Sequence, residues 1–283
     1  MKIVRQKSDL RALTRKWRAE GASIGVVPTM GALHEGHLSL VTAASARADR
    51  VIVTLFVNPT QFNNAEDLEK YPRTEDSDAE QLAPFDVDVL YIPDVDQIYP
   101  QGFATAITVS GLTDRLCGAT RPGHFDGVAT VVTKLLLQTD ADLAFFGEKD
   151  FQQLQVVRRL VTDLDIATEI IGCPTVRETD GLAMSSRNLR LGPAARRNAP
   201  AMRAALAEAA DGIASGEAPG PALDTVRQRL TAAGFGPIDY LEFCREDDLQ
   251  PITEPGGSGR ILVAAWLDGV RLIDNVIAAP SGT

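Results

Sequence analysis

The sequence predicts an α/β protein in which a doubly wound parallel sheet is joined to a smaller C-terminal α+β domain that carries an antiparallel sheet. Three observations lead to this fold class. Short β-rich segments alternate with helical patterns up to about residue 175, as in βαβ units. After residue 187 the chain becomes rich in alanine. Finally, Asp268-Gly269 between two β-like runs is a strong signal for a two-residue hairpin.

The parallel sheet is predicted from β-rich segments and from the connections between them. The segments lie at residues 23–27, 51–57, 87–92, 143–146 and 169–171. Apolar residues recur at spacings of three and four over residues 38–48, 128–138 and 151–164, as in crossover helices that pack on a sheet. We therefore expect a first domain over residues 1–175.

The C-terminal part has a different pattern. Residues 194–214 and 222–233 have helical composition, and a Gly- and Pro-rich stretch separates them. Strands are expected at residues 238–243, 261–267 and 270–277, with a surface loop at residues 254–259. This pattern predicts a second domain over residues 176–283.

The composition is that of a folded enzyme and not of a nucleic-acid-binding protein. The 283 residues include 28 basic and 38 acidic side chains, which gives a formal net charge of −10, and 45% of the residues are apolar. Binding to a phosphate backbone depends on clustered Lys and Arg, and the sequence has no such run, so we expect no nucleic-acid partner. It also has no apolar run of about 18 residues, so we expect no membrane span.

The cysteines and the N-terminus bear on the compartment. Cys117, Cys173 and Cys244 lie too far apart in the sequence for a disulfide framework or a Cys-x-x-Cys zinc pair. The charged N-terminus lacks the apolar stretch of a signal peptide. Both features predict a reducing, cytoplasmic location.

The segment PTMGALHEGH at residues 28–37 predicts an anion site. It follows the first strand and leads into a helix, so His34 and His37 lie one turn apart near a helix N-terminus. Unpaired N–H groups, the helix dipole and two imidazoles suit the phosphates of a nucleotide, and Gly31 and Gly36 permit close approach. Zinc is a weaker alternative, because metalloprotease histidines are four residues apart. A helix cap is the alternative role for one histidine.

Two further segments follow predicted strands or open helices. FVNPTQF at residues 56–62 brings Asn58 and Gln61 to the carboxyl end of the second strand, where amides can bind the hydroxyls of a small polar acid. RPGHFDGV at residues 121–128 offers Arg121 and His124 as anion contacts. For each segment, a purely structural turn is an equally good interpretation.

Cationic and hydroxyl groups come from two other segments. FFGEKD ends a buried strand, so Lys149 points from the carboxyl edge of the sheet and can neutralise phosphate charge. DGLAMSSRN at residues 180–188 offers Ser185, Ser186 and Arg187 in a loop that can close over a triphosphate. An exposed lysine and a pair of capping serines are the structural alternatives. The acidic segment YPRTEDSD could hold a divalent cation, although such a run is more often a solvated helix start.

Taken in order, these segments resemble the pantothenate synthetase (pantoate beta-alanine ligase) family, which belongs to the HxGH nucleotidyltransferases. The end of the chain, GRILVAAWLDGVRLIDN, is similar to the C-terminal strands of that family. The resemblance implies a Rossmann-like domain with a small lid domain, and a homodimer. It also implies that ATP and pantoate form pantoyl adenylate and pyrophosphate, after which the amine of beta-alanine displaces AMP to give pantothenate.

The resemblance also implies roles for individual residues. The implied ATP site consists of Met30, Gly31, Ala32, Leu33, His34, Glu35, Gly36, His37, Gly147, Glu148, Lys149, Asp150, Val176, Met184, Ser185, Ser186 and Arg187. The implied catalytic set is His34, His37, Lys149, Ser185, Ser186 and Arg187. Gln61 and Gln153 would hold pantoate, and Gln61 would also serve beta-alanine. His37 would donate a proton to the leaving group or a hydrogen bond to its developing charge. For Mg²⁺, only Asp78 is carried over, because Ser77 stands where members of the family often have an adjacent acid.

The chemistry of these residues agrees with the resemblance. Adenylyl transfer needs positioning and charge neutralisation more than a protein nucleophile, and the candidates are donors and cations. Two alternatives have the same features: an adenylyltransferase that joins AMP to a phosphate-bearing acceptor, and a nucleotide-binding protein without turnover. Gln61, Gln153 and Lys149 together disfavour the second alternative.

Overall fold

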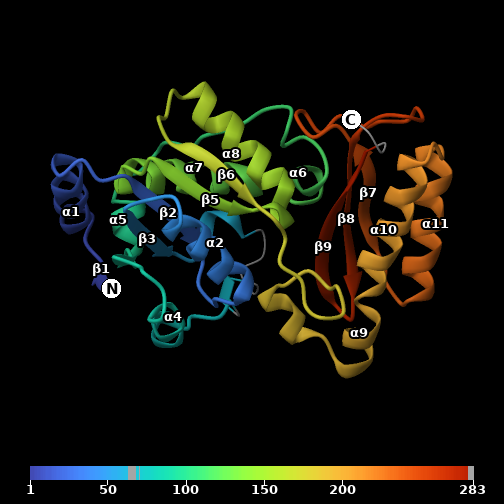
Figure 1. Ribbon diagram of the computed structural model, residues 1–283, viewed down its shortest axis with the longest axis horizontal. Helices are drawn as coiled ribbons and strands as arrows, with labels where there is room; N and C mark the ends of the chain where they lie inside the picture. The colour runs from blue at the N-terminus through green and yellow to red at the C-terminus, as the bar shows by residue number, and fades with distance from the viewer. Residues whose placement is uncertain (63–67, 70, 280–283) are drawn as a thin grey trace.

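The computed structural model describes residues 1–62, 68–69 and 71–279 and contains a six-stranded parallel sheet (Figure 1). The strands lie in the order β1-β4-β3-β2-β5-β6. They are β1 (Lys2–Val4), β2 (Ile24–Thr29), β3 (Arg50–Leu55), β4 (Val89–Tyr91), β5 (Leu143–Gly147) and β6 (Glu169–Cys173). The predicted doubly wound sheet is confirmed, with β1 as an edge strand that the sequence pattern did not indicate.

Helices cover both faces of this sheet. They are α1 (Lys7–Ala19), α2 (Glu35–Ser45), α4 (Glu75–Leu82), α5 (Val95–Ile98), α6 (Cys117–Thr120), α7 (His124–Thr139) and α8 (Phe151–Asp163). Helices α1, α7 and α8 share one apolar core with Phe146, whereas α2 and α4 share the other with Phe145. Neighbouring residues of a strand point to opposite faces, so this pair joins both cores.

Helix α1 was not predicted from the sequence. Its many charged residues hide a narrow buried stripe at spacings of four and three, formed by Leu10, Thr14 and Trp17.

The C-terminal part forms a three-stranded antiparallel sheet, β7-β8-β9, with helices packed on it. Its elements are α9 (Pro193–Asn198), α10 (Ala201–Ala214), α11 (Pro219–Ala232), β7 (Ile238–Cys244), β8 (Gly259–Leu267) and β9 (Val270–Ala278). The hairpin prediction is confirmed: Leu267 pairs with Val270, and both Asp268 and Gly269 have positive φ. The single helix expected over residues 194–214 is wrong, because the chain breaks it near Pro200 into α9 and α10.

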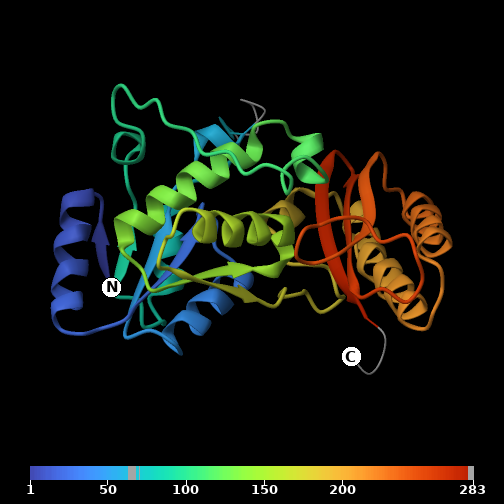
Figure 2. The same ribbon diagram turned by 90° about the horizontal axis from the view of Figure 1, so that it is seen from above.

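The small sheet lies between the parallel-sheet body and its own helices (Figures 1 and 2). Leu272 packs into the core formed with α10 and α11, whereas Leu262 joins the core that contains α7 and α8. The sheet thus buries both faces, and β9 runs beside the carboxyl edge of the large sheet (Figure 1). The predicted division between residues 175 and 176 falls in the segment that connects the two sheets and stays a prediction.

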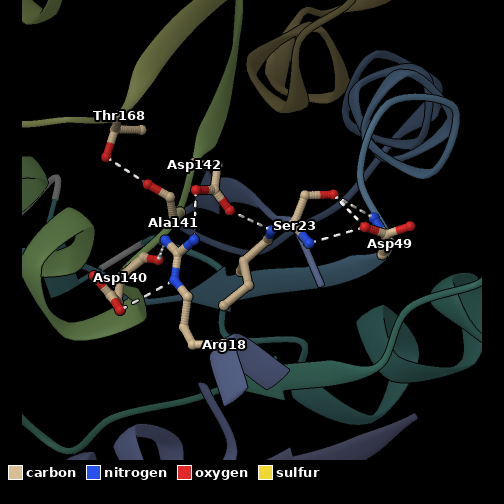
Figure 3. A network of polar contacts seen from close by, with 8 residues as sticks. Arg18, Ser23, Asp49, Asp140, Ala141, Asp142 and Thr168 are labelled. Carbon is tan, nitrogen blue, oxygen red and sulfur yellow. Dashed lines mark hydrogen bonds and ion pairs between the residues drawn. The ribbon is translucent and has the colours of Figure 1, made fainter. Parts of the chain in front are cut away.

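Polar contacts fasten the amino edge of the parallel sheet (Figure 3). The Arg18 guanidinium donates to Asp142 Oδ1 at 2.5 Å, and Asp142 Oδ2 accepts the backbone N–H of Ile24 at 2.7 Å. The Thr168 hydroxyl donates to the Ala141 carbonyl at 2.7 Å. These contacts fix the starts of β2, β5 and β6 at the edge opposite to the predicted nucleotide site.

Within the described ranges, every helix is too short or too polar to span a bilayer.

Candidate active site

A cavity of about 230 Å³ opens at the carboxyl ends of β2 and β5. Open α/β sheets bind ligands at this edge. Its wall includes predicted residues from four separate segments: Met30, His34, Gly36 and His37; Gln61; Gly147, Lys149, Asp150 and Gln153; and Val176, Met184, Ser185, Ser186 and Arg187. The fold therefore brings together most of the groups that the sequence nominated.

The two histidines lie at the start of α2. The His34 Nδ1 accepts the backbone N–H of Gly36 at 3.1 Å, so His34 is the N-cap of the helix, and its other nitrogen carries the proton. The centroids of the His34 and His37 rings are 4.1 Å apart. The helix-cap alternative is thus correct for His34, and it is compatible with a site role because both rings also line the cavity.

Both rings are neutral in this environment. Burial is the main cause that lowers the pKa of His37 to about 3, and repulsion from Lys149 and from a protonated His34 adds to it. Burial and Lys149 also lower the pKa of His34. The His37 Nδ1 is buried and has no hydrogen-bond partner among the residues that the structure describes. A neutral imidazole has one N–H, so each ring can donate one hydrogen bond at neutral pH, and neither carries a full positive charge.

The loop before His34 is held by Asp78. Gly31 and Ala32 both have positive φ, 85° and 51°, which turns the chain sharply after β2. The Asp78 carboxylate accepts the backbone N–H of Ala32 at 3.0 Å and of Leu33 at 2.8 Å. It also accepts the Thr74 hydroxyl at 3.1 Å. Asp78 is 1% exposed, and these three donors supply the hydrogen bonds that a buried carboxylate requires.

Gln61 is positioned by the two segments that the sequence left undecided. It ends η1 (Pro59–Gln61), where the Asn58 amide donates to Gln61 Oε1 at 3.1 Å. The His124 Nδ1 lies 2.9 Å from the Gln61 carbonyl oxygen, and the Arg121 Nη2 donates to the same oxygen at 3.2 Å. Burial and the charge of Arg121 lower the pKa of His124 to about 4, so this ring is also neutral. Asn58, Arg121 and His124 therefore have structural contacts in addition to their places in cavity walls.

The charged groups of the site come from η2 (Glu148–Asp150) and from the first turn of η3 (Ser186–Arg190), which carries Arg187. Loss of solvation acts to raise the pKa of Asp150, and the charges of Lys149 and Arg187 outweigh it, so the pKa lies below its usual range. The Ser185 hydroxyl accepts the backbone N–H of Arg187 at 3.2 Å and caps η3, as the structural alternative expected.

A second cavity of about 510 Å³ continues from the first toward the small sheet. The two share Lys149, Asp150, Gln153, Ser185 and Arg187. We refer to these two adjoining cavities as the cleft, and together they offer room for a nucleotide and a second substrate.

Some predicted residues lie outside this cleft. The described walls of the two cavities omit Gly31, Ala32, Leu33, Glu35, Glu148 and Asp78. Gly31, Ala32 and Leu33 shape the turn that precedes His34, and Glu35 is exposed at the helix start. Their backbone positions, more than their side chains, belong to the site.

Sequence reasoning also missed residues of the cleft. Tyr71 lines the smaller cavity, and Asp239, Tyr240, Arg271, Asp274 and Asn275 line the larger one. The only signal for the last two was a polar pair inside the β-like run at residues 270–277. Their places depend on contacts between segments more than 90 residues apart, such as Arg177 with Asp274, which a local pattern does not contain.

Comparison with known proteins decides the family. The profile described as Pantoate-beta-alanine ligase matches residues 2–277. The chain belongs to this family. A relative from Chelativorans sp. named Pantothenate synthetase is 61% identical over 280 residues, which cover 99% of each chain. A relative of the same name from Ruegeria pomeroyi is 58% identical over 274 residues, 97% of this chain and 96% of that protein.

Solved structures of the family have the same fold. Pantothenate synthetase from Thermus thermophilus aligns with a TM-score of 0.93 at 43% identity and covers 99% of this chain and 100% of that one. Pantoate-beta-alanine ligase from Francisella tularensis, described as complexed with beta-gamma ATP and beta-alanine, aligns with a TM-score of 0.83 at 36% identity, with 98% of each chain covered. The resemblance inferred from the ordered motifs is confirmed.

Proposed function

We propose that this chain condenses pantoate with beta-alanine at the expense of ATP, through a pantoyl adenylate, and releases AMP and pyrophosphate. The observation that carries the proposal is the convergence of His34, His37 and Lys149 with Ser185, Ser186 and Arg187 on one cavity at a helix N-terminus. These groups are donors and cations, which is what a triphosphate requires.

In the first step, a carboxylate oxygen of pantoate attacks the α-phosphorus of ATP. A new P–O bond forms as the bond to the β-phosphate oxygen breaks, and pyrophosphate leaves with the electron pair. Lys149 and Arg187 neutralise the developing charge, and His37 donates a hydrogen bond to it. Because burial lowers the pKa of His37, we assign the neutral ring hydrogen-bond donation to the phosphate oxygens in this proposal.

In the second step, the neutral amine of beta-alanine attacks the acyl carbon of the adenylate. The C–N bond forms, the bond from carbon to the phosphate oxygen breaks, AMP leaves with that electron pair, and the nitrogen loses a proton. No covalent enzyme intermediate is needed. Gln61 lies in the wall of the same cavity and serves both pantoate and beta-alanine in this proposal.

The pantoate part of the cavity combines amides with branched apolar side chains. Gln61 and Gln153 offer donors and acceptors for hydroxyl groups, and Val128, Val131 and Val132 of α7 line the same space. Pantoate carries two hydroxyl groups, which suit the amides, and a carbon with two methyl groups, which suits the valine side chains.

Magnesium enters this proposal with ATP. Both oxygens of Asp78 already accept N–H or O–H groups, and Asp78 is outside the described cavity walls, so the predicted ligand does not fit the ion. Among the described residues, no group of three His, Cys, Asp or Glu side chains is placed to hold a metal. Mg²⁺ typically uses phosphate oxygens with one or two carboxylates, and Asp150, which lines both cavities, fits that role. Bound there, the ion would neutralise phosphate charge.

Two further features belong to the proposal. The three cysteines are free, which supports action in a reducing cytoplasm. The family resemblance supports a homodimer, for which light scattering of the purified protein should give twice the 30.4 kDa mass of the chain.

Product analysis tests the reaction. AMP and pyrophosphate release from ATP should require pantoate, and pantothenate should form only when beta-alanine is added. Release that is indifferent to pantoate, or a dinucleotide-like product with a phosphate-bearing acceptor, would contradict the proposal.

A further inference from the structure

Strand β9 carries two adjacent buried polar side chains, Asp274 and Asn275. They are 4% and 5% exposed, in a strand whose neighbours Leu272 and Val270 belong to an apolar core. Burying an amide and a carboxylate is unfavourable unless their hydrogen bonds are made. The hydrogen-bond partners of these two residues therefore indicate their structural role.

Asn275 holds the turn that carries Lys149. Its Nδ2 donates to the carbonyl oxygen of Glu148 at 2.9 Å and to that of Lys149 at 3.0 Å. Its Oδ1 accepts from Arg260 Nη1 at 2.6 Å, so both ends of the amide are used and its orientation is defined. The Arg260 guanidinium lies 3.9 Å from the centre of the Phe151 ring, directly after η2.

Asp274 holds the base of the loop that carries Ser185, Ser186 and Arg187. Arg177 donates to both carboxylate oxygens of Asp274, at 2.7 and 2.9 Å, a bidentate pair. Arg177 also donates to the Gly181 carbonyl at 3.1 Å and pairs with Ala183 in an isolated β-bridge. The chain leaves Arg177 and returns beside it at Ala183, and Asp274 holds Arg177 in place.

The two contacts lie on opposite faces of the small sheet. Adjacent strand residues point to opposite sides, and the residue paired with Asn275 is Leu262, which packs in the core of the parallel-sheet domain. The backbone N–H of Asn275 donates to Asp274 Oδ1 at 2.7 Å, which joins the two contacts directly. One pair of adjacent residues therefore hydrogen-bonds to the turn that carries Lys149 directly and, through Arg177, to the loop that leads to Arg187.

We propose that Asp274 and Asn275 are positioning residues for adenylate formation, which fix the distance between Lys149 and the loop of Ser185 to Arg187 across the nucleotide site. This inference rests on the proposed function. Neither residue needs to touch the reacting atoms. Removing one anchor shifts Lys149 or the loop relative to the phosphates, and a displacement of about 1 Å can lower a rate by up to about a hundredfold.

The test is the pantoate-dependent exchange of labelled pyrophosphate into ATP by the Asn275→Ala and Asn275→Asp variants. Asn275→Asp keeps the size and the acceptor for Arg260 but removes both N–H donors. We expect kcat/KM for ATP to fall at least about tenfold in both variants. The matched control is Thr168→Val, which loses one buried hydrogen bond to a backbone carbonyl at the opposite edge of the sheet (Figure 3) and should stay within about twofold of the wild type.

The outcomes separate positioning from stability and from the proposed function. Wild-type kcat/KM in a folded Asn275→Asp variant, or a loss no greater than that of Thr168→Val at an equal melting temperature, would overturn the positioning role. If both Asn275 variants fail to fold, Asp274→Asn decides: it should raise the KM for ATP by several-fold, and an unchanged KM contradicts the proposal. Absence of exchange in the wild-type protein would contradict the proposed reaction instead. In that case ATP binding measured by calorimetry still tests the positioning role, which predicts weaker binding in the variants.

Discussion

The two histidines of α2 lie one turn apart and have different surroundings. His34 uses Nδ1 to cap the helix, which leaves its other nitrogen as an N–H donor, whereas the Nδ1 of the more deeply buried His37 has no partner among the described residues. Their rings are close enough that protonating one disfavours protonating the other. The site therefore relies on Lys149 and Arg187 for positive charge and on the imidazoles for directed hydrogen bonds.

Replacement of Lys149 tests whether its positive charge stabilises the transition state of the reaction. Lys149→Ala should lower kcat by about a hundredfold or more, because loss of one transition-state donor commonly has that effect. The control is Lys16→Ala, whose side chain is 71% exposed on α1. Steady-state rates at saturating ATP are the measurement, and an unchanged rate would remove Lys149 from the mechanism.

Gly36 sets the distance between the helix start and the His34 ring. A Cβ at position 36 would lie 2.9 Å from His34 Cε1, closer than real contacts allow, so Gly36→Ala should displace the ring. Since alanine favours helices by about 1 kcal/mol over glycine, we expect little loss of stability but at least a tenfold loss of kcat. Gly220→Ala, in α11 with open space around it, is the control and should keep full activity. A fully active Gly36→Ala variant would show that the His34 ring has no fixed role.

At the scale of elements, the carboxyl edge of the parallel sheet is completed by a helix that is distant in sequence. The first turn of α4 carries Asp78 to the loop after β2, 45 residues from its partner Leu33. The loop therefore depends on a long-range contact, although its own residues follow one another in a dense motif. The same principle applies to β9, which holds η2 from the other side.

Asp78→Asn separates the structural role of this carboxylate from a metal-binding one. The amide keeps one acceptor oxygen and places an N–H₂ group against a backbone N–H, so we expect the free energy of unfolding to fall by about 1–3 kcal/mol. Asp76→Asn, exposed on the same helix, should have little effect. Denaturant unfolding and the Mg²⁺ dependence of the rate are the measurements. Wild-type stability combined with a higher Mg²⁺ requirement would identify Asp78 as a metal ligand after all.

The sequence predicted those elements whose signal is local. The β-rich segments, the crossover helices and the Asp268-Gly269 hairpin all depend on residues near one another, and each is found close to its expected position. The helix α1 was missed because charge masks its narrow stripe, and the break at Pro200 was missed because alanine dominates the surrounding composition. The site motifs were recognisable one by one, but the roles of Asp78 and Asn275 arise from tertiary contacts.

At the scale of the whole molecule, burial of neutral histidines makes stability depend on pH. The pKa is about 3 for His37 and about 4 for His124, against about 6.5 in an unfolded chain. Between these values the unfolded state binds more protons than the folded state, so stability is complete above about pH 6.5 and is lost as pH falls toward 4. Each unit of difference corresponds to about 1.4 kcal/mol.

We therefore expect a lower melting temperature at pH 5 than at pH 7.5. In the His37→Gln variant the difference between the two pH values should shrink, because one of the three histidines whose pKa burial lowers is gone. Thermal unfolding followed by circular dichroism measures both proteins. Equal melting temperatures of the wild type at the two pH values would contradict the buried, neutral state of these rings.

The two sheets and the cleft between them form one nucleotide site in this account. Lys149 comes from η2, which follows β5, and Ser185 to Arg187 form the start of η3. Strand β9 of the small sheet is hydrogen-bonded to the Lys149 carbonyl directly and to the Gly181 carbonyl through Arg177. Pyrophosphate exchange into ATP in the absence of beta-alanine tests the central claim most directly, because it isolates adenylate formation. Exchange should appear when pantoate is added and be negligible without it; exchange that ignores pantoate, or none at all with ATP bound, would contradict the account.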